Sequence, residues 1–509
     1  MSELFPGIPT FSPPVATPRH ASAVILWREG AAGREVFWVR RGASLRFAGG
    51  FYAFPGGKVD AADARVPVDG ALGNEAAQWV SAARELFEET GVLLATGAQR
   101  LSADERAEAR LGVLEQRLLF NDFLASNGLS LESSIFTPAG RWVTPPFAPV
   151  RFDAHFFLAQ LPEGQSAQVW PGELSDGEWI RCEDALAAWR EGRVLLHPPS
   201  RWVMECLAAA APPHCLPALL SPPHCVAHVS TRVDFQEHVC VVPLRTPTLP
   251  PATHTNTYVV GARELVLVDP GSGEPDELAR LFAVLESFAQ EGRRVTQLWL
   301  THHHADHVGG LAACVERFGV PVLAHPETAS RLGLPCVPVD EGALLLGRWR
   351  VLHTPGHARG HLCFFDENTR AALVGDLVST VSTVVIDPPE GDMAEYLRQL
   401  ARLRSLAPRT LYPAHGQPAV DAVGKLDEYL AHRAVREAKI VMALESEPFA
   451  PGVPGHSLQA VTALAYDDTP VFIHPLAARS CLAVLEKLTA EGRVRRESEH
   501  WMLSETGRG

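Results

Sequence analysis

Apolar runs that end in an acid or a histidine recur through the second half of this chain. The runs at residues 265–268 and 297–300 lead into Asp269 and into a histidine-rich segment, and two later runs end at Asp376 and His415. Short apolar runs bounded by turn residues are typical of buried strands. The pattern therefore predicts a sheet fold with its chemically active side chains along one rim.

Helical periodicity marks other parts of the chain. Residues 75–90 form a helix-prone stretch, which Gly91 ends or turns. Near the C-terminus, residues 425–447 and 476–488 repeat a helical pattern, and residues 493–503 have the pattern of a short hairpin. These last elements predict a small helical module behind the sheet fold.

An Ala- and Pro-rich stretch at about residues 208–223 separates the two halves of the chain. The phrase Pro-Pro-His-Cys occurs at residues 212–215 and again at residues 222–225. Two His-Cys pairs could form a zinc site, but adjacent ligands in a Pro-rich stretch match known zinc spacings poorly. We therefore interpret the stretch as a linker in which a short phrase is duplicated.

Length and composition fit more than one catalytic domain. The chain has 509 residues, 46% of them hydrophobic, which is enough for roughly two to four domains with large cores. No apolar run approaches a membrane span, and residues 1–20 carry Pro and polar residues in place of a signal core. The nine cysteines are scattered without a CxxC pair and are odd in number, which predicts a cytoplasmic protein without disulfides.

The charge balance weighs against nucleic acid as a partner. The chain has 45 basic and 59 acidic residues, for a formal net charge of −14. Non-specific nucleic-acid binding relies on a cationic surface. We therefore expect a small-molecule substrate and no DNA partner, and RNA only in a locally basic groove.

The histidine-rich segment holds the strongest chemical signal. His302, His304 and Asp306 alternate, so an extended segment would point them to one side, and His307 would reach a neighbouring point. Nitrogen and oxygen ligands grouped this way suit Zn²⁺ or a similar transition metal, and two separate points suit two ions. The alternative is a solvated loop that happens to be rich in histidine.

Further candidate ligands follow this segment in order. His357 stands beside a Pro-Gly turn, and Asp376 and His415 come at strand ends. Together with the acidic turn at Asp269, this series of separated motifs resembles the metallo-β-lactamase-fold hydrolases over about residues 236–420. The resemblance implies an αββα sandwich with a two-metal site on one rim.

The same resemblance implies a role for each ligand. One ion would be held by His302, His304 and His357, the second by Asp306, His307 and His415, with Asp376 as the bridge. Water between two such ions becomes hydroxide near neutral pH and is the expected nucleophile. Asp306 is in addition a candidate catalytic residue, and His361 is interpreted as a buried histidine beside the site that is not a ligand.

A second chemical centre is predicted on the helix at residues 75–90. Glu85, Glu88 and Glu89 stand at i, i+3 and i+4, which places three carboxylates on one helix face. Like charges so close call for a cation, most simply Mg²⁺ or Mn²⁺. An ordinary solvated acidic face is the alternative, and we take the three glutamates as candidate metal ligands and catalytic residues.

The string Arg-Glu-Leu-Phe-Glu-Glu-Thr-Gly-Val that begins at Arg84 resembles the second half of the Nudix box, and Gly56-Gly57 resembles its glycine turn. The interval from Gly57 to Arg84 is 27 positions, longer than in the family. Counted back from Arg84, the early glutamate of the box falls on Ala76. The resemblance therefore implies a Nudix hydrolase with a loop inserted between the glycine turn and the metal-binding helix.

Residues ahead of the glycine turn point to a substrate class. Arg41, Arg46 and Gly50 stand before Gly56-Gly57 at the spacing of the signature in coenzyme A diphosphatases of the Nudix family. Guanidinium groups suit bidentate contacts with phosphate. We take Arg41, Arg46, Gly56 and Gly57 as candidate substrate-binding residues, with a solvated surface pair as the alternative reading of the two arginines.

These resemblances imply an α/β multidomain chain. Its parts are expected to be an N-terminal tail at residues 1–17, a Nudix α/β/α sandwich at 18–205, a linker at 206–235, a metallo-β-lactamase-fold domain at 236–420, and a C-terminal module at 421–509. Helices followed by a hairpin resemble the winged-helix-like module appended to one branch of lactamase-fold proteins. From residue 477 onward six basic residues nearly balance five acidic ones, which favours a packing or substrate-shaping role over nucleic-acid binding.

The leading functional prediction is a bifunctional, metal-dependent hydrolase. The Nudix half would cleave a diphosphate bond in a nucleoside-diphosphate-linked metabolite such as coenzyme A or an acyl-CoA. The other half would hydrolyse an ester or thioester through hydroxide held by its metals. The alternative is that the lactamase-fold half is a metal-dependent ribonuclease, since the branch with the winged-helix-like tail includes nucleases.

Overall fold

The computed structural model describes residues 14–43, 45, 48–70, 73–170, 172–446 and 455–504. They form two compact units, the first spanning Pro14–Cys240 and the second beginning at Val241. No helix among these residues is long and apolar enough to cross a membrane.

The first unit is built around one large sheet. The strands of this unit, not all of which belong to that sheet, are β1 (Arg19–Gly30), β2 (Gly33–Arg41), β3 (Tyr52–Ala53), β4 (Gly56–Lys58), β5 (Val68–Asp69), β6 (Leu131–Glu132), β7 (Thr137–Val143), β8 (Phe152–Gln160), β9 (Leu174–Arg181), β10 (Cys225–Val226), β11 (Val229–Ser230) and β12 (Val233–Gln236). Its α-helices are α1 (Gly73–Thr90), α2 (Ala103–Leu114), α3 (Phe120–Ser126), α4 (Cys182–Arg190), α5 (Pro198–Ala209) and α6 (Leu216–Leu219).

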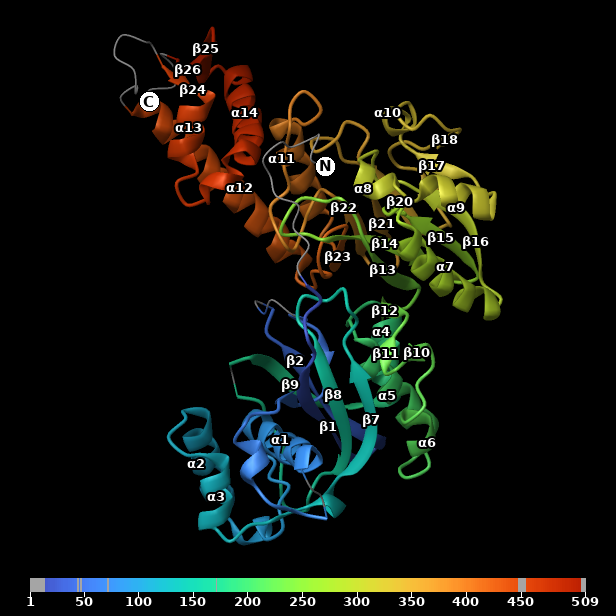
Figure 1. The fold of residues 1–509 in the computed structure, drawn as a ribbon, viewed down its shortest axis with the longest axis vertical. Helices are drawn as coiled ribbons and strands as arrows, with labels where there is room; N and C mark the ends of the chain where they lie inside the picture. Colours follow the sequence, from blue (N-terminus) through green and yellow to red (C-terminus); the bar gives the residue numbers. More distant parts are fainter. Residues whose placement is uncertain are drawn as a thin grey trace. The chain divides into compact units, whose positions relative to one another are not determined.

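The sheet has the strand order β10-β11-β7-β8-β1-β2-β3, with β4 paired to β1 and β9 paired to β2 (Figure 1). Side chains along β1 alternate between its two faces. Val24 and Leu26 enter an apolar core with residues of α1, whereas Ile25 enters a core with residues of α4 and α5. The sheet therefore lies between two helical layers, which is the predicted α/β/α sandwich.

Residues 206–235, for which the sequence predicts a linker, fold onto this sheet. Residues 206–235 contain the end of α5, the short helix α6 and the strands β10 to β12. Val229 of β11 pairs with Val143 of β7. Cys215 is 1% exposed and lies in the same apolar core as Trp189 of α4. Part of this stretch therefore extends the sheet at its β7 edge.

The second unit contains two sheets and most of the remaining helices. Its strands are β13 (Val239–Arg245), β14 (His254–Val260), β15 (Glu264–Val268), β16 (Arg294–Trp299), β17 (Val322–Ala324), β18 (Val337–Pro338), β19 (Leu344–Leu345), β20 (Trp349–His353), β21 (Leu362–Asp366), β22 (Ala371–Gly375) and β23 (Thr410–Pro413). The accompanying helices are α7 (Pro275–Gln290), α8 (Ala305–Val308), α9 (Leu311–Phe318), α10 (Pro326–Ala329) and α11 (Met393–Ser405).

These two sheets face each other across an aromatic core. One contains β13-β14-β15-β16-β17-β18 in this order, and the other has the order β19-β20-β21-β22-β23. Trp299 of β16 packs against Trp349 of β20 and Phe364 of β21, with ring centroids 6.5 and 4.9 Å apart. Helix α7 packs on β16. This arrangement is the predicted αββα sandwich.

A helical module follows the second sheet. It consists of α12 (Ala422–Glu445), α13 (Leu458–Ala465) and α14 (His474–Ala490), with β24 (His456–Ser457), β25 (Val494–Glu497) and β26 (His500–Leu503). Its small sheet has the order β24-β26-β25, so the predicted hairpin is present as β25 and β26. In Figure 1 the module is drawn in orange to red, with α14 beside α11, and the two helices are in contact.

Candidate active sites

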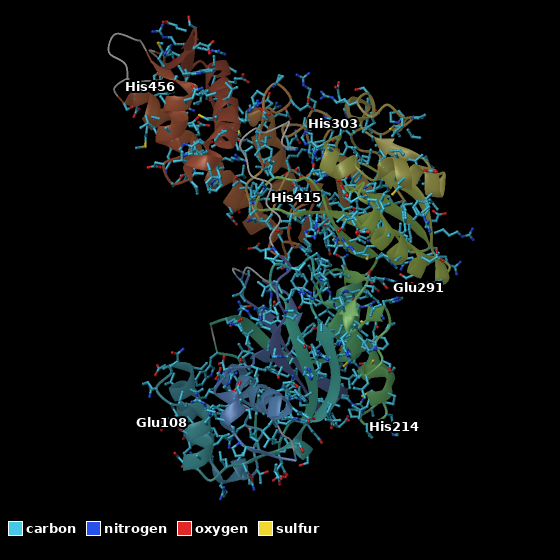
Figure 2. All side chains as sticks on the ribbon, in the orientation of Figure 1. Glu108, His214, Glu291, His303, His415 and His456 are labelled. Atoms are coloured by element: carbon cyan, nitrogen blue, oxygen red, sulfur yellow. The ribbon has the colours of Figure 1, made fainter. Side chains whose placement is uncertain are left out.

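The second unit gathers its candidate metal ligands where strands end. The segment with His302 and His304 follows β16, Asp376 follows β22, and His415 follows β23. Figure 2 labels His415 and also His303, which lies between the first two ligands in sequence. The donor atoms form three sets, and the atoms within each set all lie within 4.8 Å of one another. These sets are His302, His304 and His357; His302, His307 and Asp376; and Asp306, His307 and His415.

Asp376 stands between the two groups of histidines. Its Oδ2 is 3.5 Å from His357 Nε2, and its Oδ1 is 3.3 Å from His415 Nε2 and 3.5 Å from His307 Nε2. Within the described part of the chain, Asp376 Oδ1 and His307 Nε2 are buried atoms without a hydrogen-bond partner. Buried polar atoms are normally paired, so this arrangement fits bound cations. Imidazole nitrogens mixed with carboxylates suit Zn²⁺ or a similar transition metal.

Backbone carbonyls determine which ring nitrogen faces this cluster. His357 Nδ1 lies 2.9 Å from the carbonyl oxygen of Val385, and His415 Nδ1 lies 3.0 Å from that of His254. A carbonyl oxygen can only accept a hydrogen bond, so Nδ1 carries the proton in both rings. Nε2 is then left with a free lone pair, which is the state that a metal ligand requires.

Asp269 holds His307 in the same way. Its Oδ2 lies 2.8 Å from His307 Nδ1, while the backbone N–H and the hydroxyl of Thr301 donate to its carboxylate at 2.7 and 2.5 Å. The sequence analysis noted the acidic turn at Asp269 and assigned it no role. Asp269 follows a buried strand, as the ligands Asp376 and His415 do, and this shared position in the sequence could have indicated a role at the site.

His361 lies beside the cluster and belongs to none of the three donor sets of the described residues. It is fully buried, its Nε2 accepts the backbone N–H of Asp376 at 3.1 Å, and its Nδ1 lies 2.8 Å from the hydroxyl of Thr354. Burial lowers the pKa of His361 to about 3. A neutral ring that fixes the backbone of Asp376 agrees with the expectation of a buried histidine next to the ligands.

Burial and neighbouring charge divide the ligands into two kinds. For His302 and His304, burial and then the adjacent imidazoles hold the pKa well below its usual value. For His307 and His415, burial opposes the charged form, but the neighbouring carboxylates, Asp376 first among them, together outweigh it and raise the pKa. Burial raises the pKa of Asp376, whereas His415 and His307 lower it well below its ordinary value. Asp376 is therefore held as a carboxylate between two imidazoles.

In the first unit the candidate acids lie on α1, opposite the glycine turn. The backbone N–H of Gly56 donates to Glu89 Oε2 at 2.9 Å. A Cβ atom on Gly56 would lie 2.2 Å from the backbone carbonyl oxygen of Ser22, so only glycine fits there, and a Cβ atom on Gly57 would lie 2.3 Å from the carboxyl group of Glu85. The oxygens of Glu85, Glu88 and Glu89 are less tightly gathered than the ligands of the second unit, since no donor set within 4.8 Å among the described residues includes them.

Burial shifts the protonation of all three glutamates in the same direction. It raises the pKa of Glu85 to about 7, raises that of Glu88, and raises that of Glu89 well above its ordinary value. The nearby Arg84 opposes the shift at Glu85 and Glu88. Carboxylates that resist ionisation here would be stabilised as anions by a cation, so the face fits a hard ion such as Mg²⁺ or Mn²⁺.

Arg84 is anchored by a residue that the sequence analysis missed. Its Nε and Nη2 donate to the two carboxylate oxygens of the buried Asp63, both at 2.9 Å. Asp63 stands six residues after Gly57, between the glycine turn and α1. Counting back from Arg84 led to Ala76 and therefore did not identify this acid.

The structure describes one of the two arginines that are predicted to bind substrate. Arg41 Nη2 lies 3.0 Å from Glu173 Oε1, and the carbonyl of Glu173 accepts the N–H of Gly42 at 2.9 Å. Both Arg41 and Glu173 act on the pKa of Glu89, which places them near the acidic face. Arg46 lies outside the described residues. Arg41 is thus close to the site but is paired with a carboxylate.

These folds and donor sets are those of hydrolases, and comparison with known proteins gives the families. The Metallo-beta-lactamase superfamily model matches residues 250–335 and 336–415, the Beta-lactamase associated winged helix domain matches residues 457–501, and the NUDIX domain matches residues 17–197. The chain belongs to the metallo-β-lactamase superfamily and carries a NUDIX domain ahead of that fold and a winged helix domain behind it.

Each of three individual relatives covers less than half of this chain. The Beta-lactamase-like protein 2 homolog of Drosophila melanogaster is 30% identical over 263 residues, 47% of this chain and 84% of that protein. An Atrochrysone carboxyl ACP thioesterase of Aspergillus chevalieri is 30% identical over 253 residues, 47% of this chain and 77% of that protein. A crystal structure of a NUDIX hydrolase from Alicyclobacillus acidocaldarius is 31% identical, with a TM-score of 0.34, and covers 38% of this chain and 93% of its own.

Proposed function

We propose that the chain is a bifunctional hydrolase with one metal site in each unit. The second unit would hydrolyse an ester or thioester, and the first would cleave the diphosphate bond of a nucleoside-diphosphate-linked metabolite such as coenzyme A or an acyl-CoA. The observation that carries the proposal is the position of Asp376 between two groups of histidine nitrogens. The thioesterase among the relatives supports a thioester substrate.

In the second unit we assign His302, His304 and His357 to one ion, Asp306, His307 and His415 to the other, and Asp376 to both, with Zn²⁺ as the expected metal. Such ions, when bound, supply a water that is acidic enough to react at neutral pH. The chain orients the ligands through Asp269 and through the carbonyls of Val385 and His254. Asp306 Oδ2 lies 3.5 Å from His415 Nε2. In addition to its role as a ligand, we assign Asp306 a role in catalysis.

In the first unit we assign Glu85, Glu88 and Glu89 to Mg²⁺ or Mn²⁺. Such an ion, when bound, would stabilise the charge that develops on a diphosphate during cleavage. The backbone N–H of Gly56 donates to Glu89, and Gly57 lies against the carboxyl group of Glu85, so the glycine turn holds the acidic face in place. Arg41 would meet the substrate after it leaves Glu173, and Arg46 keeps its sequence-based assignment.

The side chains next to the dinuclear cluster bear on the ribonuclease alternative. Arg331 approaches His303 at 3.3 Å, but its charge is opposed by Glu390 at 2.6 Å. Arg359 adds one exposed cation, and Val381 adds an apolar side chain that is 42% exposed. A polyanion requires an excess of cations along its path. This mixed rim favours a small acyl substrate over RNA.

The two activities can be separated in the full-length protein with one variant in each site. Asp376→Ala should abolish hydrolysis of an acyl-CoA thioester, followed as free thiol, and leave cleavage of the coenzyme A diphosphate intact. Glu89→Gln should do the opposite. An RNA oligonucleotide serves as the third substrate, and RNA cleavage that depends on Asp376 without thioester hydrolysis would replace the thioesterase proposal with the nuclease. We also propose a cytoplasmic location, as the scattered cysteines of odd number in the sequence predict.

A further inference from the structure

The winged helix module shares its apolar core with the lactamase fold. Val384 and Ile386, which belong to the loop after the ligand Asp376, lie in one buried cluster with Ala477, Cys481 and other side chains of α14. The module is therefore packed directly against a loop of the candidate metal site. We refer to residues 377–387 as the ligand loop.

Helices α11 and α12 hold the first part of the ligand loop. The hydroxyl of Tyr396 donates to the carbonyl of Leu377 at 2.8 Å. The hydroxyl of Tyr429 accepts the N–H of Ser379 at 2.8 Å and lies 2.7 Å from the carbonyl of the same residue. These contacts fix the backbone directly after Asp376, so the loop is attached to helices on more than one side.

In the last part of the ligand loop, one peptide group connects α14 to the ligand His357. The N–H of Ile386 donates to Ser480 Oγ at 3.2 Å, and the carbonyl of Val385 accepts the Nδ1 proton of His357 at 2.9 Å. This N–H and this carbonyl belong to the same planar peptide unit. Any rotation of the peptide would therefore break both contacts together.

Two contacts with the flanking residues limit the movement of the same peptide. Arg433 of α12 donates to the carbonyl of Val384, and Arg479 Nη1 of α14 lies 3.2 Å from Asp387 Oδ1. Ser480 itself is 7% exposed and thus shielded from water. Its hydroxyl is the acceptor for the one donor on the peptide that orients His357.

We propose that Ser480 is a positioning residue for the metal ligand His357. It acts from the winged helix module through the Val385–Ile386 peptide, which sets the tautomer and direction of the imidazole. The role rests on the metal site proposed above. It gives the module a function inside the hydrolase site.

The contact can be tested in the full-length protein after chelation of all metals. In Ser480→Ala the Ile386 amide loses its acceptor, so its hydrogen exchange should accelerate at least tenfold, while amides of β21 exchange as before. Ser480→Thr keeps the Oγ acceptor and should retain the parental rate. Thr462→Ala is the matched control, because Thr462 is buried in the same module and its hydroxyl bonds to the carbonyl of Leu458 and to Cys481 of α14.

The consequence is measured with Co²⁺, by its absorption spectrum and by competition with a chelator. Removing a group that orients a metal ligand typically weakens metal binding by about 10–100-fold, and we expect about tenfold for one of two ions in Ser480→Ala. Ser480→Thr and Thr462→Ala should bind both ions like the parent. Parental affinity in Ser480→Ala, or an equal loss in Thr462→Ala, would overturn the role of Ser480. A parent protein that binds no Co²⁺ would instead overturn the metal site on which that role rests.

Discussion

Replacing Asp63 with asparagine removes the carboxylate that anchors Arg84 in the first unit. The wild-type pair has two hydrogen bonds of 2.9 Å, with Asp63 fully buried and the Arg84 side chain 11% exposed. Breaking a buried ion pair costs about 3–5 kcal/mol when the other charge is left unpaired. Arg84 keeps Glu85 at 2.8 Å and Glu88 at 3.5 Å, so we expect a loss near the lower limit, about 3 kcal/mol.

The same change should weaken Mg²⁺ binding. Once Asp63 no longer holds the guanidinium, Arg84 can lean further onto Glu85 and Glu88 and compete with the cation for their oxygens. Hydrogen exchange of α1 peptides is measured in the full-length chain as a function of denaturant concentration. It reports the free energy of unfolding of the first unit separately from that of the second. Asp60→Asn is the matched control, because Asp60 is 68% exposed and 3.8 Å from Arg84, and an exposed pair contributes about 0–1 kcal/mol.

A loss in Asp63→Asn no larger than that in Asp60→Asn would refute this reasoning. It would mean that Glu85 and Glu88 suffice to hold Arg84. A large loss of stability with unchanged Mg²⁺ affinity would keep the anchor but exclude the competition between Arg84 and the cation. The two measurements therefore test the two steps separately.

Four further outcomes follow from the sites. Asp376→Ala should lower the bound transition metal from two ions to one or fewer per chain, by elemental analysis, because both ions share this carboxylate. Glu89→Gln should reduce Mg²⁺-dependent diphosphate cleavage more than about a hundredfold without lowering the unfolding midpoint of the metal-free protein, since the buried group already favours its neutral form. Mg²⁺ affinity measured by calorimetry should rise with pH through about 7, where Glu85 ionises. Arg41→Ala should lower kcat/KM for coenzyme A about tenfold or more through a lost charge-assisted contact, whereas Glu173→Gln, which frees Arg41, should raise it.

The shifted pKa of Glu85 also affects stability in the absence of metal. Its folded-state value of about 7 lies above the ordinary 4.5, so the folded protein binds more protons between these values. The contribution of Glu85 to stability is therefore complete below about pH 4.5 and declines as pH rises through 7. Added Mg²⁺ should reverse this trend, since the ion binds the ionised carboxylates; a metal-free protein that gains stability over this range would contradict the assignment.

The sequence by itself determined both fold classes and nearly all of the candidate ligands. Alternating histidines after one strand and acids at i, i+3 and i+4 on a helix place donors on one side by local geometry alone. That information needs no knowledge of the rest of the chain. The families were recognisable for the same reason, because their motifs are short segments with fixed internal spacing.

Only the tertiary structure decided which groups hold those donors in place. Asp63 reaches Arg84 across 21 residues, Ser480 reaches Ile386 across 94, and the carbonyl of His254 reaches His415 across 161. A backbone carbonyl or N–H has no signature in the sequence, since every residue except proline carries both. Periodicity describes neighbours along one element, whereas these contacts depend on how separate elements pack, and packing is set by the whole core at once.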